Sequence, residues 1–324
     1  MRTTGGFSHV CLPARLPFRR RSKVRRVRAL ITGGRGFVGT WLGAYLRAEG
    51  DQVVSIDQEV EITDATAVRE AVIAAVPDAL YHLAALTHVG RSWDDPGEVF
   101  RVNALGTLNV LEAAKACARA PRVLITSSAE VYGSVTAGEL PVREEAPLAP
   151  VTPYGASKVA AEFLAIQAHL GHGLPVIRVR PFNHVGPGQG SGFVVPSLAS
   201  HIVAARSSGA KSIPVGNLGA RRDLTDVRDV VRAYRLLVEQ GAPGEVYNVC
   251  SGHDVSIEEV ARTLLELAGV DLQFVVDPAL ARPVDVPVLC GDPAKLHAAT
   301  GWESEIDLSR TLRDVLDQYS EKVA

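Results

Sequence analysis

Residues 32–39 read Thr-Gly-Gly-Arg-Gly-Phe-Val-Gly, between an apolar run and a helical pattern. A strand, a glycine-rich turn and a helix in this order can bind the phosphates of a dinucleotide. Gly33 permits the tight turn, Gly36 lets the backbone approach a pyrophosphate, and Gly39 lets the helix pack closely on the strand. The spacing is GxxGxxG rather than GxGxxG, and an ordinary glycine corner between strand and helix is the structural alternative.

Apolar, β-rich runs alternate with helical patterns through the first half of the chain, which predicts an α/β fold with a Rossmann-type, doubly wound parallel sheet. We expect strands at 27–32, 52–57, 79–83, 122–127 and 174–180, and helices at 36–49, 65–75, 99–118 and 154–170. The Gly/Pro-rich stretch after residue 181 predicts a loop without regular structure. Further helices are expected at 196–207, 227–240, 256–268 and 308–319, and strands at 245–250 and 272–276.

This pattern predicts an NAD(P)-binding Rossmann domain at 27–182 and a smaller α/β substrate domain, mainly at 183–324. Parts of 220–252 are expected to return to the first domain. Residues 1–28 hold nine Lys and Arg and no acid, so 1–26 are predicted to be a disordered basic tail. A targeting segment, or translated sequence upstream of the natural start, is the alternative.

Composition narrows the class of protein. Outside residues 1–28 the chain has 25 Lys and Arg and 36 Asp and Glu, a net charge of −11. This acidic balance gives no support to nucleic-acid binding. No apolar stretch approaches the ~18 residues needed to cross a membrane. Four cysteines lie far apart without a CxxC pair, as expected of reduced thiols in the cytoplasm, and no metal site is predicted.

Asp57 ends the second expected strand, where an acid can accept hydrogen bonds from the adenosine ribose and repel a 2′-phosphate. Arg35 favours NADP(H) instead, because a cation in the glycine turn can hold the 2′-phosphate. We therefore expect NAD(H) to be favoured and NADP(H) to be tolerated. Asp64 can accept from the adenine amino group or cap the helix at 65–75, and the sequence does not decide between the two.

Tyr154 and Lys158 are four residues apart, so one helix face presents both. A free tyrosine has a pKa near 10. A neighbouring ammonium and a nicotinamide cation are expected to lower that pKa, which suits proton transfer to a carbonyl. Ser128 ends the fourth strand, where its hydroxyl can hydrogen-bond the substrate oxygen. The alternative is a surface tyrosine on an amphipathic helix.

Several motifs together resemble the extended short-chain dehydrogenase/reductases that act on nucleotide sugars. They lie at 32–39, 81–85 (YHLAA), 103 (Asn), 127–133 (SSAEVYG), 154–158 (YGASK) and 180–189 (RPFNHVGPGQ). Within that family, the segments 215–234, 245–252 and 282–296 are most similar to GDP-4-keto-6-deoxy-D-mannose reductases, which are close to GDP-mannose 4,6-dehydratases.

The resemblance implies the catalytic roles. Tyr154 is the acid/base, Lys158 lowers its pKa and holds the nicotinamide ribose, and Ser128 polarises the C4 carbonyl. Glu130 is ambiguous, because a glutamate two residues after the strand-four hydroxyl abstracts the C5 proton in 4,6-dehydratases but also occurs in reductase-type sequences. The implied reaction is NAD(P)H-dependent reduction of a GDP-4-keto-6-deoxyhexose to GDP-D-rhamnose or its epimer. Dehydration and 4-epimerisation are the alternatives, and a non-catalytic nucleotide-binding scaffold is a remote one.

The resemblance also implies ligand contacts and an assembly. Cofactor contacts are Gly33, Arg35, Gly36, Phe37, Val38, Gly39, Asp57, Asp64, Leu83, Ala84, Ala85, Asn103, Tyr154, Lys158 and Pro181. Substrate contacts are His88, Arg91, Ser128, Asn183, Arg222, Arg282 and Asp285. For Arg222 an ion pair with Asp223 or Asp226 is the alternative, and for Arg282 a surface pair with Asp285. His184 is expected to pack the loop, and Glu144 to be a solvated loop acid. A homodimer through a four-helix bundle is expected.

Overall fold

The computed structural model describes residues 26–280 and 286–321. Its larger sheet is parallel throughout. The strand order is β2 (Gln52–Ile56), β1 (Arg28–Thr32), β3 (Ala79–His82), β4 (Arg122–Thr126), β5 (Val176–Pro181) and β9 (Val246–Val249). The carboxyl ends of these strands lie at one edge, and the order reverses between β1 and β3, which is where such sheets bind ligands. The expected Rossmann-type fold is confirmed.

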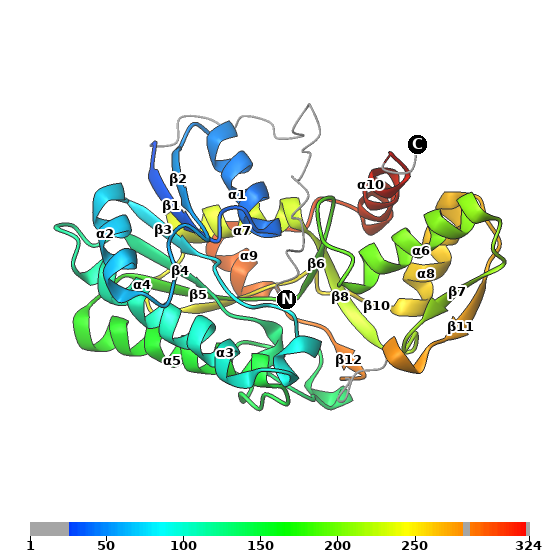
Figure 1. Cartoon of the computed structure of the whole chain (residues 1–324). Helices are drawn as coiled ribbons and strands as arrows, with labels where there is room; N and C mark the ends of the chain where they lie inside the picture. The colour runs from blue at the N-terminus through cyan, green and yellow to red at the C-terminus, as the bar shows by residue number, and fades with distance from the viewer. Residues whose placement is uncertain (1–25, 281–285, 322–324) are drawn as a thin grey trace.

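Helices cover both faces of this sheet (Figure 1). One face carries α2 (Ala65–Ala75), α4 (Gly106–Lys115) and α5 (Pro153–His172), and the other carries α1 (Phe37–Ala48), α7 (Val227–Gln240) and α9 (Ala294–Thr300). Leu30 and Ile31 are adjacent in β1 and point to opposite faces, and each is fully buried in a different apolar cluster. Burial on both faces explains why the central strands are almost continuously apolar.

The single helix expected at 99–118 is wrong in detail. The structure has α3 (Pro96–Phe100), a π-helical turn, η2 (Arg101–Leu105), and then α4, which ends at Lys115. Asp95 caps α3 by accepting from the Glu98 N–H, and Pro96 occupies its first turn, so the helical run begins earlier than expected. π-Helical turns are common at functional sites.

A second lobe packs around its own core (Figure 1). Its helices are α6 (Val194–Ser208), α8 (Ile257–Ala268) and α10 (Leu308–Glu321), and its strands β7 (Ser212–Val215) and β11 (Gln273–Val276) pair in parallel. α8 starts at a capping box between Ser256 and Glu259 and ends at Gly269 in the left-handed conformation.

The stretch after residue 181 contains a strand that was not expected, whereas residues 186–193 form the irregular loop that the glycines and prolines predict. Residues Asn183–Val185 form β6, which pairs in parallel with β8 (Arg221–Asp226). β8 also pairs with β10 (Asp254–Ser256) and β12 (Val288–Leu289). This small sheet lies between the two lobes (Figure 1). Single-turn 3-10 segments complete the described chain: η1 (Gly90–Trp93), η3 (Ala129–Val131), η4 (Ala137–Glu139) and η5 (Pro278–Leu280).

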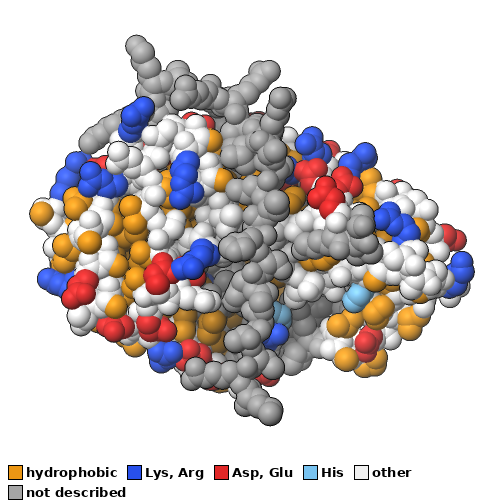
Figure 2. Space-filling view, turned by 45° about the horizontal axis from the view of Figure 1, so that its top comes forward, with side chains coloured by type: hydrophobic (Ala, Val, Ile, Leu, Met, Phe, Trp, Pro, Cys, Tyr) orange, Lys and Arg blue, Asp and Glu red, His pale blue; other side chains and the backbone are white. Residues whose placement is uncertain are grey.

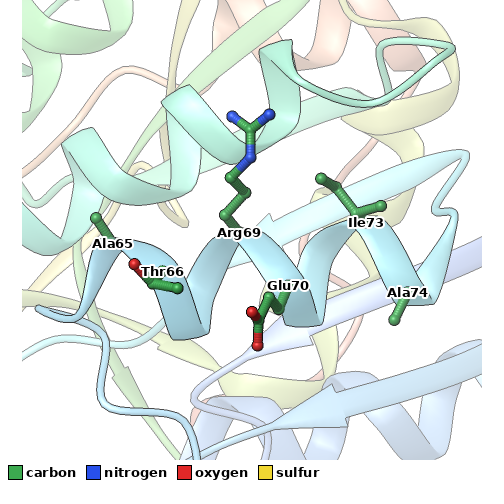
Figure 3. A pocket seen from close by; sticks show the side chains of 6 residues that line it. All are labelled: Ala65, Thr66, Arg69, Glu70, Ile73 and Ala74. Atoms are coloured by element: carbon green, nitrogen blue, oxygen red, sulfur yellow. The ribbon is translucent and has the colours of Figure 1, made fainter.

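The surface carries Lys/Arg and Asp/Glu side chains interspersed over the face shown in Figure 2. Among the described residues, no helix is both long and apolar enough to cross a membrane. A shallow groove runs along α2 (Figure 3), lined by Ala65, Thr66, Arg69, Glu70, Ile73 and Ala74. None of these residues belongs to the predicted site, so we assign the groove no chemistry.

Candidate active site

At Gly33 and Gly39 the glycine turn leaves no room for a side chain. Gly33 has φ +70°, and a Cβ there would lie 2.8 Å from the Ala84 nitrogen. A Cβ on Gly39 would lie 2.2 Å from the Gly33 oxygen. α1 begins at Phe37 and Val38 with no side-chain cap on its first N–H groups. A glycine cradle beside an uncapped helix N-terminus fits the diphosphate of a dinucleotide.

Two acids were predicted at the adenosine end. Asp57 directly follows β2, and its Oδ2 accepts a hydrogen bond of 2.8 Å from the Arg35 N–H in the glycine turn. Asp64 caps α2, its Oδ1 accepting from the Thr66 and Ala67 N–H groups at 2.9 and 3.1 Å. The structure therefore gives Asp64 the capping role, whereas Asp57 lies against the turn where a ribose is expected.

The proton-transfer residues come together at the ends of β4 and α5. Thr152 caps α5 through the Gly155 N–H, which places Tyr154 in the first helical turn. Lys158 Nζ donates to the Thr126 oxygen at 2.9 Å and lies 5.9 Å from the centroid of the Tyr154 ring. Ser128 is hydrogen-bonded to Tyr154. All three residues are at least nine-tenths buried.

Burial controls the protonation of this pair. It raises the pKa of Tyr154 well above the usual value of 10, against the lowering effect of the Ser128 hydrogen bond. Burial lowers the pKa of Lys158 to about 8, which the charge of Glu162 opposes. The direction for Tyr154 is thus opposite to the one expected from the sequence, because burial outweighs the hydrogen bond from Ser128. The phenol is protonated at neutral pH, which is the form that donates a proton.

Glu130 lies in η3, two residues after Ser128, and is half-buried. Its negative charge contributes to the raised pKa of Tyr154, after the larger effect of burial. Its backbone N–H donates to Ser128 Oγ at 3.2 Å, which helps to fix the serine.

Asn103 lies in the π-helical turn η2 and connects it to the segment after β3 and to α5. Its Oδ1 accepts from the Leu86 N–H at 2.8 Å, and its Nδ2 donates to the Leu86 oxygen at 3.1 Å and to Ser157 Oγ at 3.0 Å. Ser157 Oγ in turn donates to the backbone carbonyl oxygen of Tyr154 at 2.7 Å. Asn103 therefore ties the segment after β3 to the first turn of α5.

A buried histidine with no predicted role continues this network to the glycine turn. His82 lies between Thr32 Oγ1, 2.8 Å from its Nδ1, and Thr107 Oγ1, 3.0 Å from its Nε2. The Thr107 hydroxyl donates to the Asn103 carbonyl, so it accepts from His82 Nε2–H. His82 Nδ1 must then accept from the Thr32 hydroxyl, and the oxygen of this hydroxyl accepts from the Ala84 N–H. Burial lowers the pKa of His82 to about 3, which keeps this neutral tautomer.

The remaining predicted cofactor residues surround the same edge. Leu83, Ala84 and Ala85 follow β3 and are half-buried, and the Leu83 N–H donates to the Thr32 oxygen at 3.2 Å. Pro181 is the last residue of β5. These residues therefore lie at the carboxyl ends of β3 and β5, at the same edge of the sheet as the glycine turn.

The predicted substrate residues are partly brought together. Asn183 is exposed on β6, opposite Leu224, and the buried Arg222 is two residues away on β8. Arg222 Nη1 donates to the Arg221 oxygen at 2.8 Å. Asp226 pairs with Arg228, and Asp223 accepts from Ser251, Gly252 and Gly291, so both acids have other partners.

Two predicted residues lie in the segment after β3. His88 is exposed, and its ring is tilted against Phe193 with centroids 6.1 Å apart. Arg91 is exposed in η1, and its N–H donates to His88 Nδ1 at 3.3 Å. Arg282 and Asp285 lie outside the described residues.

His184 has the packing role expected of it. Its ring stacks on Phe37 at 6.1 Å, and its Nδ1–H donates to the Phe182 oxygen at 3.1 Å. Glu144, expected to be solvated, is instead buried, and its Oε1 accepts from the Asn248 N–H at 2.7 Å. The peptide that carries Glu144 is fixed by Arg180, which donates to its oxygen.

Glu162 was missed, although it follows Lys158 by one helical turn. It is fully buried and accepts two hydrogen bonds of 2.8 Å from Arg180. Arg180 also donates to Tyr132 Oη at 3.0 Å, so the pair links α5, β5 and the segment after η3. A carboxylate beside the apolar residues Ala161 and Ala165 of the same helix was the available signal, because buried acids are almost always paired.

Within residues 26–280 and 286–321, no three His, Cys, Asp or Glu side chains form a group that could hold a metal ion. The features described above are a nucleotide cradle, a Ser/Tyr/Lys set and a buried hydrogen-bond network. On this sheet topology, that combination defines the extended short-chain dehydrogenase/reductase class of enzymes.

Comparison with known proteins gives the family. Residues 58–315 match the family described as GDP-mannose 4,6 dehydratase, and the chain belongs to it. It is 38% identical over 299 residues to the GDP-6-deoxy-D-mannose reductase of Pseudomonas aeruginosa, covering 91% of this chain and 98% of that protein. It is 26% identical to the GDP-mannose 4,6-dehydratase of Yersinia enterocolitica, over 89% of this chain and 92% of that protein.

Solved structures agree with this assignment. The Pseudomonas aeruginosa protein RMD in complex with NADPH has a TM-score of 0.84 and 37% identity, covering 91% of this chain and 99% of that one. The Thermus thermophilus UDP-glucose 4-epimerase in complex with NAD has a TM-score of 0.81 and 30% identity, covering 90% and 98%.

Proposed function

We propose that this protein reduces the C4 ketone of a GDP-4-keto-6-deoxyhexose, with NAD(P)H, converting GDP-4-dehydro-6-deoxy-D-mannose to GDP-D-rhamnose. The observation that carries the proposal is the joint burial of Ser128, Tyr154 and Lys158 at the end of β4, on the same sheet edge as the glycine turn. The 38% identity to GDP-6-deoxy-D-mannose reductase favours this substrate over other keto sugars.

The chain's residues supply the proton side of the reaction. When bound, the reduced nicotinamide supplies the hydride that reduces the carbonyl carbon. Tyr154, protonated because burial raises its pKa, gives its proton to the carbonyl oxygen. Ser128 donates to the same oxygen and orients it, and Lys158 favours the phenolate that remains.

The nucleotide-sugar contacts are part of the proposal. Arg222 suits the diphosphate, because a guanidinium can bind two phosphate oxygens at once. Asn183, His88 and Arg91 are proposed to contact the sugar nucleotide from β6 and from the segment after β3. For Arg282 and Asp285 the expected contact with the nucleotide remains a prediction.

Asp57 supports NAD(H) as the favoured cofactor, with NADP(H) tolerated. Its carboxylate lies at the turn where the adenosine ribose is expected, and a 2′-phosphate would be repelled there. The NADPH complex of the Pseudomonas aeruginosa relative is the reason to test both cofactors.

Reduction is tested by supplying the purified protein with GDP-4-keto-6-deoxymannose and NADH or NADPH. We expect one equivalent of reduced cofactor to be consumed per sugar, followed by absorbance at 340 nm, with the alcohol identified by mass spectrometry and NMR. Unchanged absorbance with a folded protein that binds cofactor contradicts the proposal. Interconversion of C4 epimers without added cofactor indicates an epimerase instead.

Dehydration is the second candidate, because Glu130 lies in η3 two residues after Ser128 and its charge acts on Tyr154. The test is incubation with GDP-mannose alone. A dehydratase forms the 4-keto-6-deoxy sugar without added reductant, whereas a reductase leaves GDP-mannose unchanged. Glu130→Gln should abolish dehydration but leave a reductase at least partly active.

We also propose a homodimer in the cytoplasm, assembled through a bundle of α4 and α5 from two copies. Phe163 and Leu170 lie seven residues apart on one face of α5 and are 58% and 77% exposed. Phe100 and Leu105, on the neighbouring α3 and η2, are also exposed. Covering these side chains in a dimer removes apolar surface from water.

A further inference from the structure

Arg35 is the only side chain larger than hydrogen between Gly33 and Gly36, and its position decides what the turn offers to an adenosine ribose. Its backbone N–H donates to Asp57 Oδ2 at 2.8 Å, which fixes the carboxylate of Asp57 against the turn. Its guanidinium is on the surface, with 69% of the side chain exposed. A guanidinium in this place can bind a 2′-phosphate.

Glu59 engages that guanidinium. Its Oε2 forms an ion pair with Arg35 Nη2, while its Oε1 accepts from the Asp57 N–H at 2.9 Å. Both carboxylate oxygens therefore have partners, and the backbone hydrogen bond holds Glu59 beside Arg35. Asp57 Oδ1 accepts from the Gln58 N–H at 3.0 Å, so the whole 57–59 turn is ordered around the two acids.

The charges at this end of the site oppose a phosphate. Asp57 and Glu59 contribute two negative charges and Arg35 one positive charge, so the local sum is −1. A ribose with free hydroxyls can donate to Asp57 without disturbing the Arg35–Glu59 pair. A 2′-phosphate, in contrast, must compete with Glu59 for Arg35 and must approach two carboxylates.

We propose that Glu59 determines cofactor specificity by holding Arg35 away from the 2′-phosphate position, so that the chain selects NAD(H) over NADP(H). The inference rests on the proposed dinucleotide-dependent function. It makes Glu59 a positioning residue, which acts on the cofactor through Arg35. Its distinguishing feature is that the effect of Glu59 depends on Arg35, whereas direct repulsion of phosphate by Glu59 does not.

The test is a double-mutant cycle read as cofactor affinity. Dissociation constants for NADH and NADPH are measured by nicotinamide fluorescence on the full chain, without sugar, for wild type, Glu59→Gln, Arg35→Gln and the double variant. Glu70→Gln is the control with the same charge change, because Glu70 is exposed on α2 (Figure 3). Melting temperatures verify folding, and an exposed pair should alter them little.

We expect Glu59→Gln to tighten NADPH about tenfold, as a released charge-assisted contact allows, and to change NADH less than about twofold. In the Arg35→Gln background the same substitution should have less than about a third of that effect. Glu70→Gln should change neither affinity.

Two results would overturn the inference. One is an unchanged NADPH/NADH ratio in Glu59→Gln, and the other is an equal gain in both backgrounds, which indicates direct repulsion. Failure of the proposed function is separate: a wild type that binds neither cofactor defeats both, whereas binding without reduction of the keto sugar defeats only the function.

Discussion

At the residue scale, the decisive property of Tyr154 is that it is buried yet hydrogen-bonded. Burial raises its pKa, so the proton is present at neutral pH, while the Ser128 hydrogen bond has the opposite effect and Lys158 Nζ lies 5.9 Å from the ring centroid. A group that is stable as an acid and stabilised as a base in the transition state is what carbonyl reduction needs.

Tyr154→Phe should lower kcat by about 10²–10⁴-fold, because the substrate oxygen loses its proton donor. The dissociation constant for NADH should change little, since the ring remains. Steady-state assays and fluorescence titration measure the two quantities. Tyr45→Phe, at a buried tyrosine on α1, is the control and should keep near-wild-type kcat. Full turnover by Tyr154→Phe would contradict the assignment and revive the scaffold alternative.

Lys158 predicts the alkaline limit of activity. Its pKa is lowered to about 8, so it loses its charge as the pH rises through that value. We expect kcat/KM for NADH, which reports the free enzyme, to be level below pH 8 and to fall about tenfold per pH unit above it. Lys158→Arg keeps its charge at all these pH values and should lack the bend, at a lower overall rate. If kcat/KM of Lys158→Arg still falls above pH 8, a group other than Lys158 causes the alkaline loss of activity.

At the element scale, local signals and long-range pairing had different predictive value. The turn at Gly33 and the helix bearing Tyr154 and Lys158 follow from spacing within a few residues, so the sequence predicts them well. β6 was missed because Asn183–Val185 is a strand only through its pairing with β8, some 40 residues later. The role of His82 is equally invisible, since it needs hydroxyls from β1 and α4.

His82 links β1, β3 and α4, and it should make stability depend on pH. Its pKa is about 3 when folded and near 6.5 when unfolded, so the unfolded chain binds more protons between these values. Its contribution is therefore present above pH 6.5 and lost as the pH falls. Urea unfolding at pH 7.5 and 5.5 should show a loss of about 1 kcal/mol from this group.

His82→Gln keeps an N–H donor for Thr107 but does not titrate. The variant should be less stable at pH 7.5 and should lose less stability than wild type on going to pH 5.5. His253→Gln, at an exposed histidine, should keep the wild-type pH dependence. Parallel pH dependences for wild type and His82→Gln would contradict a neutral, buried His82.

At the scale of the whole molecule, the proposed site extends from the larger lobe to the small sheet of β6, β8, β10 and β12, which lies between the two lobes. The Ser/Tyr/Lys set lies on the larger lobe, whereas Asn183 and Arg222 lie on neighbouring strands of the connecting sheet. Any substrate that contacts both groups therefore couples the lobes. The exposed apolar face of α5 is on the larger lobe, so a dimer through α5 does not require a substrate to connect the two lobes.

The proposed dimer predicts a mass in solution of about twice the 34.5 kDa chain. Phe163→Asp combined with Leu170→Asp should shift the protein to the monomer mass in light scattering, because carboxylates cannot be buried unpaired in an apolar interface. Ile73→Asp is the matched control: Ile73 is also an exposed apolar residue, but it lies on α2, outside the proposed bundle (Figure 3). A monomeric wild type, or equal dissociation by both changes, would contradict assembly through α5.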